Sequence, residues 1–173
     1  MQTDPHHPSA LHLVCGKIAS GKSTLTRHLA SRTHTVLISE DAWLSVLYTD
    51  EIRTVSDYVR RSGQLRSVLG PHVESLLRTG LSVVLDFPAN TVGNRRWMKD
   101  IIDRSGADHQ LHFLDVPDEL CKQRLRARNA EGSHAFAPTD AEFDEITRHF
   151  VAPVTEEGFR VVRYESSLAE EGG

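Results

Sequence analysis

The sequence predicts one α/β domain in which a five-stranded parallel sheet has helices on both faces and carries a small lid. Strand-like and helix-like segments alternate five times along the chain, and this alternation is typical of parallel sheets covered by helices. A length of 173 residues fits a single domain, and no repeat or change of composition marks a boundary. We expect the domain to cover residues 11–164, between disordered tails at 1–10 and 165–173.

Five short runs with the apolar or alternating pattern of strands predict the sheet. They lie at 11–15, 35–38, 81–86, 109–116 and 159–164. The run at 81–86 is the most convincing buried strand of the five.

The segments between these runs predict helices at 22–31, 55–79, 92–105, 118–129 and 139–150. Gly70 and Pro71 interrupt the second helix, so that two helices and one broken helix are equally open. Gly80 is placed to end that segment as a C-terminal cap. Thr139 and Glu142 have the capping-box spacing that begins the last helix.

Composition excludes several classes of protein. The apolar runs are too short to cross a bilayer, and the N-terminal residues lack the features of a signal peptide. A net charge of −4 argues against a protein that coats DNA or RNA. Cys15 and Cys121 do not have the spacing of a metal site, and two reduced thiols in a cytoplasmic protein are the simplest interpretation.

The most specific motif, GKIASGKS at 16–23, matches the P-loop pattern G-x-x-x-x-G-K-[ST] without a mismatch. It follows a predicted strand and opens a predicted helix, so its amides and the helix N-terminus would hold phosphate oxygens. We expect Lys22 to contact the β- and γ-phosphates of ATP and Ser23 to coordinate Mg²⁺. The expected nucleotide-binding residues are Gly16, Lys17, Ile18, Ala19, Ser20, Gly21, Lys22, Ser23 and Thr24.

Asp86 ends the apolar strand 81–85, at the position of the acid that holds Mg²⁺ in P-loop proteins. We expect Asp86 and Ser23 to share the metal, with Asp86 acting through water. The alternative is that Asp86 merely caps the turn before Phe87 and Pro88.

The remaining pattern favours a kinase within the P-loop NTPase fold. The segment after the fourth strand lacks the residues with which a GTPase reads guanine, and the chain has no room for the helical domain of an AAA motor. Glu40 and Asp41 follow the second strand, where a carboxylate can deprotonate an acceptor hydroxyl. We favour Asp41 as this base and Glu40 less, and on an extended chain the two side chains would point to opposite faces. Either acid could instead cap a helix.

Arg124 and Arg128 lie four residues apart, on one face of a predicted helix. Guanidinium groups in such a place stabilise charge on a transferring phosphoryl group. The polar segment 129–138 follows directly, and we expect it to form a lid that closes on the nucleotide. The alternative is a solvated basic face.

The segments GKIASGKST, ISEDAWL, VVLDFPANT, LDVPDELCKQRLRARN and FVAPVTEEGF resemble the small P-loop kinases of the AAA_33 type. These are similar to the kinase domain of polynucleotide kinase, to zeta toxins and to chloramphenicol phosphotransferase. The resemblance covers 11–164. It implies a Mg²⁺- and ATP-dependent phosphotransferase in which Asp41 is the base and Arg124 and Arg128 reach the ATP phosphates.

The acceptor is expected to be a small hydroxylated molecule. Polynucleotide kinases have an arginine shortly after the catalytic aspartate, whereas Ala42, Trp43 and Leu44 follow Asp41 here. The segment 43–66 offers tyrosines and arginines that suit a sugar, an aminocyclitol, a base or a phosphorylated metabolite, and Asn90 is a further candidate contact. The alternatives are a polynucleotide or nucleotide-sugar kinase, and a nucleotide-dependent switch without an acceptor.

Overall fold

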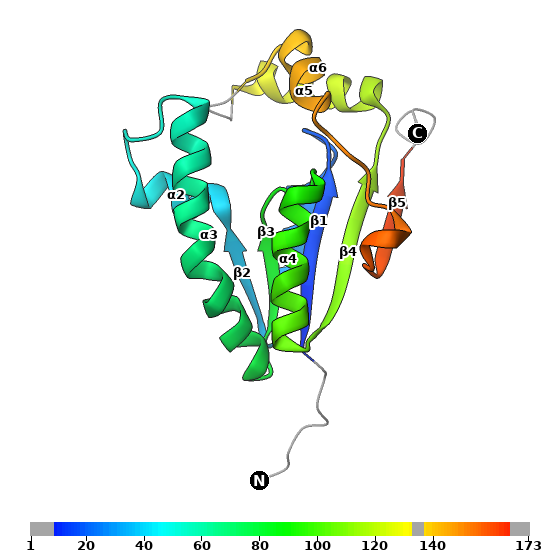
Figure 1. Cartoon of the computed structure of the whole chain (residues 1–173). Coiled ribbons are helices and arrows are strands. Elements are labelled where there is room, and N and C mark those ends of the chain that lie inside the picture. The colour runs from blue at the N-terminus through cyan, green and yellow to red at the C-terminus, as the bar shows by residue number, and fades with distance from the viewer. Residues whose placement is uncertain (1–8, 133–136, 167–173) are drawn as a thin grey trace.

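The computed structural model describes residues 9–132 and 137–166 and contains a sheet of five parallel strands. The strands are β1 (Ala10–Gly16), β2 (Thr35–Ser39), β3 (Ser82–Asp86), β4 (Asp108–Asp115) and β5 (Val161–Glu165). Their order is β2-β3-β1-β4-β5, so that β1 is the central strand (Figure 1). The five predicted strands are confirmed, with ends that differ by at most two residues.

Six α-helices and one short 3₁₀ turn occur in the described part of the chain. They are α1 (Lys22–Ala30), α2 (Glu40–Leu47), α3 (Val55–Arg78), α4 (Val92–Ser105), α5 (Asp118–Glu131), α6 (Asp140–Thr147) and the 3₁₀ turn Thr155–Glu157. Five of the helices are those that the sequence predicts. Helix α2 is not, because the segment after β2 was expected to remain extended. Helix α6 ends at Thr147, three residues earlier than predicted.

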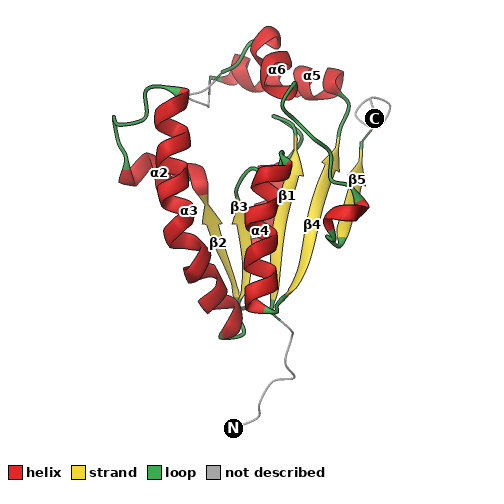
Figure 2. Cartoon of the chain, viewed as in Figure 1, coloured by secondary structure: helices red, strands yellow, loops and turns green. Residues whose placement is uncertain are grey.

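The two faces of the sheet bury alternate residues of its central strands. Leu11, Leu13 and Leu85 belong to a core cluster together with apolar residues of α3 and α4. Val14 and Val84 are as deeply buried on the alternate positions, where α1 packs against β1, β2 and β3. Figure 2 shows α3 and α4 in front of the yellow strands. The predicted arrangement of helices on both faces is confirmed.

Helix α3 is continuous through Pro71, which settles the alternative that the sequence left open. A proline inside a helix leaves one carbonyl without its amide partner, here that of Ser67. Ser67 and Pro71 are both exposed, so water can satisfy that carbonyl. The helix ends as predicted at Gly80, whose φ is +88°. The amide of Gly80 donates to the Leu77 carbonyl, and the next amide along the chain also donates back into the last turn.

The expected tails and lid are only partly described. Ala10 and Glu165 belong to strands, so the ordered chain extends one residue into each expected tail. Residues 1–8 and 167–173, and residues 133–136 of the expected lid, lie outside the described residues. Among the helices of 9–132 and 137–166, none combines the length and hydrophobicity that a bilayer-spanning segment requires.

Candidate active site

The P-loop begins at Gly16, where the carboxyl end of β1 meets the loop after β3. The Asn90 side chain brackets this glycine, because its Oδ1 accepts from the Gly16 amide at 3.0 Å and its Nδ2 donates to the Gly16 carbonyl at 2.9 Å. A Cβ at this position would lie 2.5 Å from Ser20 Oγ and 3.2 Å from the Leu114 carbonyl oxygen. Only glycine therefore fits at the start of the loop.

The loop then turns through two residues with left-handed backbone. Ala19 has φ +60° and Gly21 has φ +103°, and the Ser20 amide donates to the Lys17 carbonyl between them. A chain that turns in this way directs successive amides toward a common point, and α1 adds its own N-terminal amides directly afterwards. Ser23 and Thr24 lie exposed in the first turn of α1. The geometry fits the predicted phosphate cradle.

The two lysines of the loop point in different directions. Lys22 Nζ stays within the loop, where it donates to the carbonyls of Gly16 and Lys17 at 2.7 and 2.6 Å. Burial lowers the pKa of Lys22, although the nearby Asp86 opposes this effect. Lys17 Nζ instead pairs with Asp118 at the start of α5 and donates to the Val116 carbonyl. Lys17 can therefore hold a nucleotide only through its amide.

A cavity of about 350 Å³ lies beside Lys17, between the ends of β4 and β5. Its lining includes Val116, Pro117 and Arg163. It includes neither Lys22 nor the two acids expected to do chemistry. This cavity is therefore separate from the predicted reaction centre.

Asp41 and Asp86 come together with Lys22 at the carboxyl edge of the sheet. Ser39 at the end of β2 is in register with Asp86 at the end of β3, so the chain after β2 starts beside that acid. Burial and then the charge of Asp41 raise the pKa of Asp86. Burial and then the charge of Glu40 raise the pKa of Asp41, whereas Lys22 lowers both values. The three side chains thus share one electrostatic environment.

Glu40 is not available as a base. Its side chain is 1% exposed and accepts hydrogen bonds from Tyr58 Oη at 2.8 Å and Ser62 Oγ at 2.6 Å, besides the guanidinium of Arg66. Both acids lie in the first turn of α2, so the expectation of an extended chain with opposite side chains is wrong. The Ser39 residue that precedes them has the extended backbone of an N-cap. Of the two acids, only Asp41 remains exposed to a ligand.

Arg124 and Arg128 lie on the side of α5 that faces the P-loop. Arg124 Nη1 donates to the Ser20 carbonyl at 3.5 Å, and the charge of Arg128 lowers the pKa of Lys22. Within the described residues, Arg128 Nε is buried without a hydrogen-bond partner. The spacing that the sequence analysis identified therefore brings both guanidinium groups to the loop.

Helices α5 and α6 form one unit above the carboxyl edge of the sheet (Figure 1). Arg126 pairs with Asp140 and Lys122 pairs with Asp144, so two ion pairs join the helices. Phe143 of α6 is fully buried in the apolar cluster that α5 forms with Leu114 and Val116, and P-loop residues pack against that cluster. A movement of α5 and α6 would therefore change the packing of the P-loop residues against this cluster.

The structure gives Asn90 and Arg95 roles that the sequence analysis did not identify. Asn90, a candidate contact of the acceptor, uses its side-chain amide to donate to and accept from the backbone of Gly16. Arg95 of α4 is 0% exposed, pairs with Glu157 and donates to the carbonyls of Ala89 and Val151. An arginine in an otherwise amphipathic helix gives no signal of burial, so only the fold could reveal it.

A metal at this site would depend on the nucleotide. Among residues 9–132 and 137–166, no group of three or more His, Cys, Asp or Glu side chains could hold an ion. Ser23 and Asp86 nevertheless supply the hydroxyl and carboxylate oxygens that Mg²⁺ takes, and Mg²⁺ is usually bound through one or two carboxylates together with phosphates. The raised pKa of Asp86 beside Asp41 also marks a place where a cation would relieve repulsion. The residues present fit the predicted ion.

Comparison with known proteins identifies the family. The family model described as AAA_33, an AAA domain, matches residues 11–153. The chain belongs to the AAA_33 family. No curated protein sequence matches it.

Solved structures share the fold of this AAA_33 protein. A presumed kinase of Chloroflexus aurantiacus has a TM-score of 0.70 at 20% identity, over 95% of this chain and 88% of its own. The APS kinase of Mycobacterium tuberculosis, solved with AMPPNP and APS, has a TM-score of 0.60 at 20% identity, over 95% and 93%. A sugar kinase of Janibacter sp. has a TM-score of 0.63 at 19% identity, over 91% and 86%. The chain therefore has the fold of the P-loop kinases.

Proposed function

We propose that this protein is a Mg²⁺-dependent kinase that transfers the γ-phosphate of ATP to a hydroxyl group of a small molecule. The observation that carries the proposal is the meeting of Lys22, Asp41 and Asp86 beside the P-loop, where their charges affect one another. A binding module needs a cradle for phosphate but does not need an unpaired acid next to it. The free cysteines, both buried, agree with a cytoplasmic location for the enzyme.

The phosphates would be held by amides of the loop that follows Gly16, as far as Thr24, and by three cationic side chains. Lys22 would leave the two carbonyls that it now contacts and bind the β- and γ-phosphates. Arg124 and Arg128 would neutralise charge that develops on the transferring group. Ser23 and Asp86 would hold Mg²⁺, which, when bound, offsets the charge between the β- and γ-phosphates.

Asp41 would act on the acceptor. Its carboxylate accepts the proton of the acceptor hydroxyl, the hydroxyl oxygen forms a bond to the γ-phosphorus, and the bond from that phosphorus to the β-phosphate oxygen breaks to release ADP. The raised pKa of Asp41 makes it a better proton acceptor than an ordinary aspartate. The neighbouring Glu40 is held by its own partners and fixes the first turn of α2.

Acceptor-dependent release of ADP tests the proposal. The protein, Mg²⁺ and ATP are incubated with a protein-free metabolite extract, with 5′-hydroxyl oligonucleotides, with nucleotide sugars, or with no addition. We expect the extract to stimulate ADP release and one of its compounds to gain the mass of one phosphoryl group. Stimulation by oligonucleotides or nucleotide sugars alone would favour those acceptors. If no addition stimulates release while ATP binds, a nucleotide-dependent switch is the better interpretation.

A further inference from the structure

The segment from Glu40 to Arg66, which includes Asp41, forms one side of the carboxyl edge of the sheet. We call this segment the acceptor wall. It comprises α2, the loop 48–54 and the first half of α3, which rise together beside the sheet (Figure 1). The wall contains five carboxylates and four arginines. Its arginines are the groups that a phosphorylated or carboxylated acceptor would need. Their partners therefore indicate what kind of acceptor the wall can bind.

Arg66 is the most buried arginine of the four, and each of its three guanidinium nitrogens donates a hydrogen bond. Its Nε and Nη2 donate to Glu40 Oε1 at 3.3 and 3.2 Å, and its Nη1 donates to Asn94 Oδ1 at 2.9 Å. The guanidinium also lies 5.4 Å from the centroid of the Trp97 ring. A buried ion pair cannot exchange its partner cheaply, because a buried charge left alone is costly. The positive charge of Arg66 is therefore neutralised within the wall.

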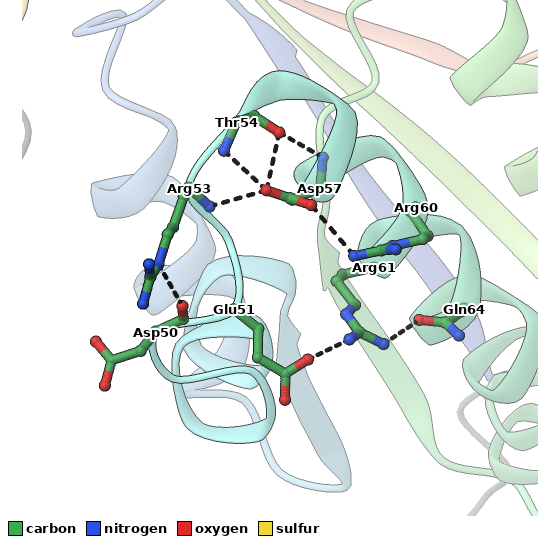
Figure 3. Close-up of polar contacts among 8 residues, drawn as sticks. All are labelled: Asp50, Glu51, Arg53, Thr54, Asp57, Arg60, Arg61 and Gln64. Atoms are coloured by element: carbon green, nitrogen blue, oxygen red, sulfur yellow. Dashed lines mark hydrogen bonds and ion pairs between the residues drawn. The ribbon is translucent and has the colours of Figure 1, made fainter.

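The three other arginines contact partners within the wall, as Figure 3 shows. Arg61 pairs with Glu51, donates to Gln64 Oε1 at 2.9 Å and lies over the ring of Tyr48. Arg60 forms an ion pair with Asp57 at 3.2 Å. Arg53 donates a hydrogen bond to the Asp50 carbonyl at 3.0 Å. The Arg61–Glu51 pair joins the loop 48–54 to α3, whereas the Arg60 contact lies within α3 and the Arg53 contact lies within the loop.

The charge that remains near the reaction centre is negative. Asp41 lies exposed in the first turn of α2, and Ser39 shortly before it is in register with Asp86 at the end of β3, so two carboxylates lie at this edge. The cations near the P-loop, Lys22 and the two arginines of α5, are required by the phosphates of ATP. Trp43, two residues after Asp41, is 40% exposed and offers an uncharged surface on the wall. An anionic acceptor would therefore meet the carboxylate of Asp41, and binding it through a wall arginine would require that arginine to give up the partners described above.

We propose that the acceptor is an uncharged or cationic polyhydroxy compound, and that the Glu40–Arg66 pair withholds from the acceptor wall the cation that a phosphorylated or carboxylated acceptor would need. This inference rests on the proposed kinase function. A neutral sugar, a cyclitol or an amino sugar has the required chemistry. Ring hydroxyls would suit the carboxylate of Asp41, and an amino group would be attracted to the net negative charge.

The test divides the protein-free metabolite extract on a strong anion exchanger before the kinase assay. ATP labelled at the γ-phosphate is added to the unretained fraction, which holds neutral and cationic compounds, and to the retained anionic fraction. We expect the greater acceptor-dependent transfer in the unretained fraction. Greater transfer to the retained fraction would overturn this inference and leave the kinase function standing. Transfer to neither fraction would overturn the proposed function and the inference with it.

A substitution in the acceptor wall tests whether the Glu40–Arg66 pair disfavours anionic acceptors. Glu40→Gln keeps the size of the side chain and one oxygen that can accept from a hydroxyl group, but it removes the charge that neutralises Arg66. We expect transfer to the retained fraction, relative to the unretained one, to rise by about tenfold, the effect of one hydrogen bond to a charged group. The double variant Glu40→Gln/Arg66→Met should return to the parental ratio. A folded Glu40→Gln protein with an unchanged ratio would contradict the assigned role of the pair.

Discussion

Lys17 and Lys22 belong to the same eight-residue motif, and their side chains serve opposite sides of the loop. Lys22 stays inside the loop among backbone carbonyls, where a phosphate would take over its hydrogen bonds. Lys17 reaches outward to Asp118 and lies 5.9 Å from the centroid of the Phe150 ring. The residue type is the same, so the difference in role comes from the direction of the loop at each position.

This difference gives a matched pair of variants. Lys22→Ala should abolish ATP turnover, with a loss of about a hundredfold or more, because it removes the charge placed for the β- and γ-phosphates. Lys17→Ala removes an equal charge but keeps the amide, and its turnover should stay within about threefold of the parent. Nucleotide binding by calorimetry and ADP release measure both. Equal behaviour of the two folded variants would be evidence against the assignment of Lys22.

Substitutions of Asp41 and Asp86 should affect different steps of the reaction. Asp41→Asn should leave nucleotide affinity nearly unchanged and slow acceptor-dependent transfer by about a hundredfold or more, the scale of general-base catalysis. Asp86→Asn should also weaken Mg²⁺-dependent nucleotide binding. The measurement is ATP affinity with and without Mg²⁺, together with the rate of transfer. Normal transfer by Asp41→Asn would mean that the carboxylate is only part of the first turn of α2.

Among the elements, α2 and the α5–α6 unit decide how the site is built. Helix α2 sets Asp41 in a helical first turn and buries Glu40 against α3. Helix α5 carries two guanidinium groups to the P-loop and is joined to α6 by ion pairs and a shared apolar cluster. Asn129 Nδ2 donates to the Pro138 carbonyl at 2.9 Å, so the two ends of the expected lid segment lie together.

The α5–α6 unit should close when a nucleotide binds. An ATP analogue that contacts Arg124 and Arg128 should slow amide hydrogen exchange over 129–138 and in α5, because the added contacts oppose local opening. The middle of α3 provides the internal control and should not change. The same measurement on Arg128→Met should show weaker protection. Identical exchange with and without the analogue would argue that the segment does not close.

Across the whole molecule, Arg95 connects three parts of the chain. It bridges α4, the loop after β3 and the segment 151–157, and its partner Glu157 has a side chain that is only 14% exposed. The same loop after β3 supplies Asn90, whose carbonyl accepts from the Val151 amide. The buried ion pair and the P-loop are thus held by one connected set of hydrogen bonds.

Breaking this pair should lower the stability of the whole domain. Arg95→Met removes the guanidinium that pairs with Glu157 and donates to three carbonyls, and the loss of one partner of a buried pair costs about 3–5 kcal/mol. Urea unfolding followed by fluorescence measures the change. Arg148→Met, which breaks an exposed pair with Glu145, is the control and should cost about 1 kcal/mol or less. A loss for Arg95→Met as small as the control would refute the assigned role.

A chain of hydrogen bonds across the sheet gives the protein a pH-dependent stability. His12 Nδ1 lies 3.1 Å from His112 Nε2, and His112 Nδ1 lies 2.9 Å from Tyr164 Oη. Burial, then the charges of His12 and Arg32, lower the pKa of His112 from 6.5 to about 4. The unfolded chain therefore binds more protons between pH 6.5 and about 4, so the free energy of unfolding should fall as the pH decreases through this range.

Urea titrations at a series of pH values test this expectation. The parent should lose stability steadily from pH 6.5 toward pH 4, and His112→Gln should show a shallower loss because it cannot take up the proton. Asp108 and Arg32 face the pair and remain in both proteins, so they do not account for the difference. Equal slopes for the two proteins would show that His112 is not the group responsible.

The sequence by itself determined the P-loop, the five parallel strands and five helices, because the pattern that predicts each of them lies within a short segment of the chain. Gly16, Lys22 and Ser23 form one contiguous motif, and strands and helices have periods of a few residues. Asp41, Asp86, Arg124 and Arg128 followed from their positions relative to those elements. The structure brings these residues to one edge of the sheet, where their roles in transfer stay predictions.

Only the tertiary structure decided the order of the strands, the helix that begins at Glu40 and the partners of the buried polar groups. Asn90 meets Gly16 across 74 residues, Arg66 meets Glu40 across 26, and Arg95 meets Glu157 across 62. Each side chain taken alone is an ordinary surface residue by its type. Its burial is favourable only when a distant segment supplies the opposite charge or the missing hydrogen bond, and no local pattern records which segment that will be.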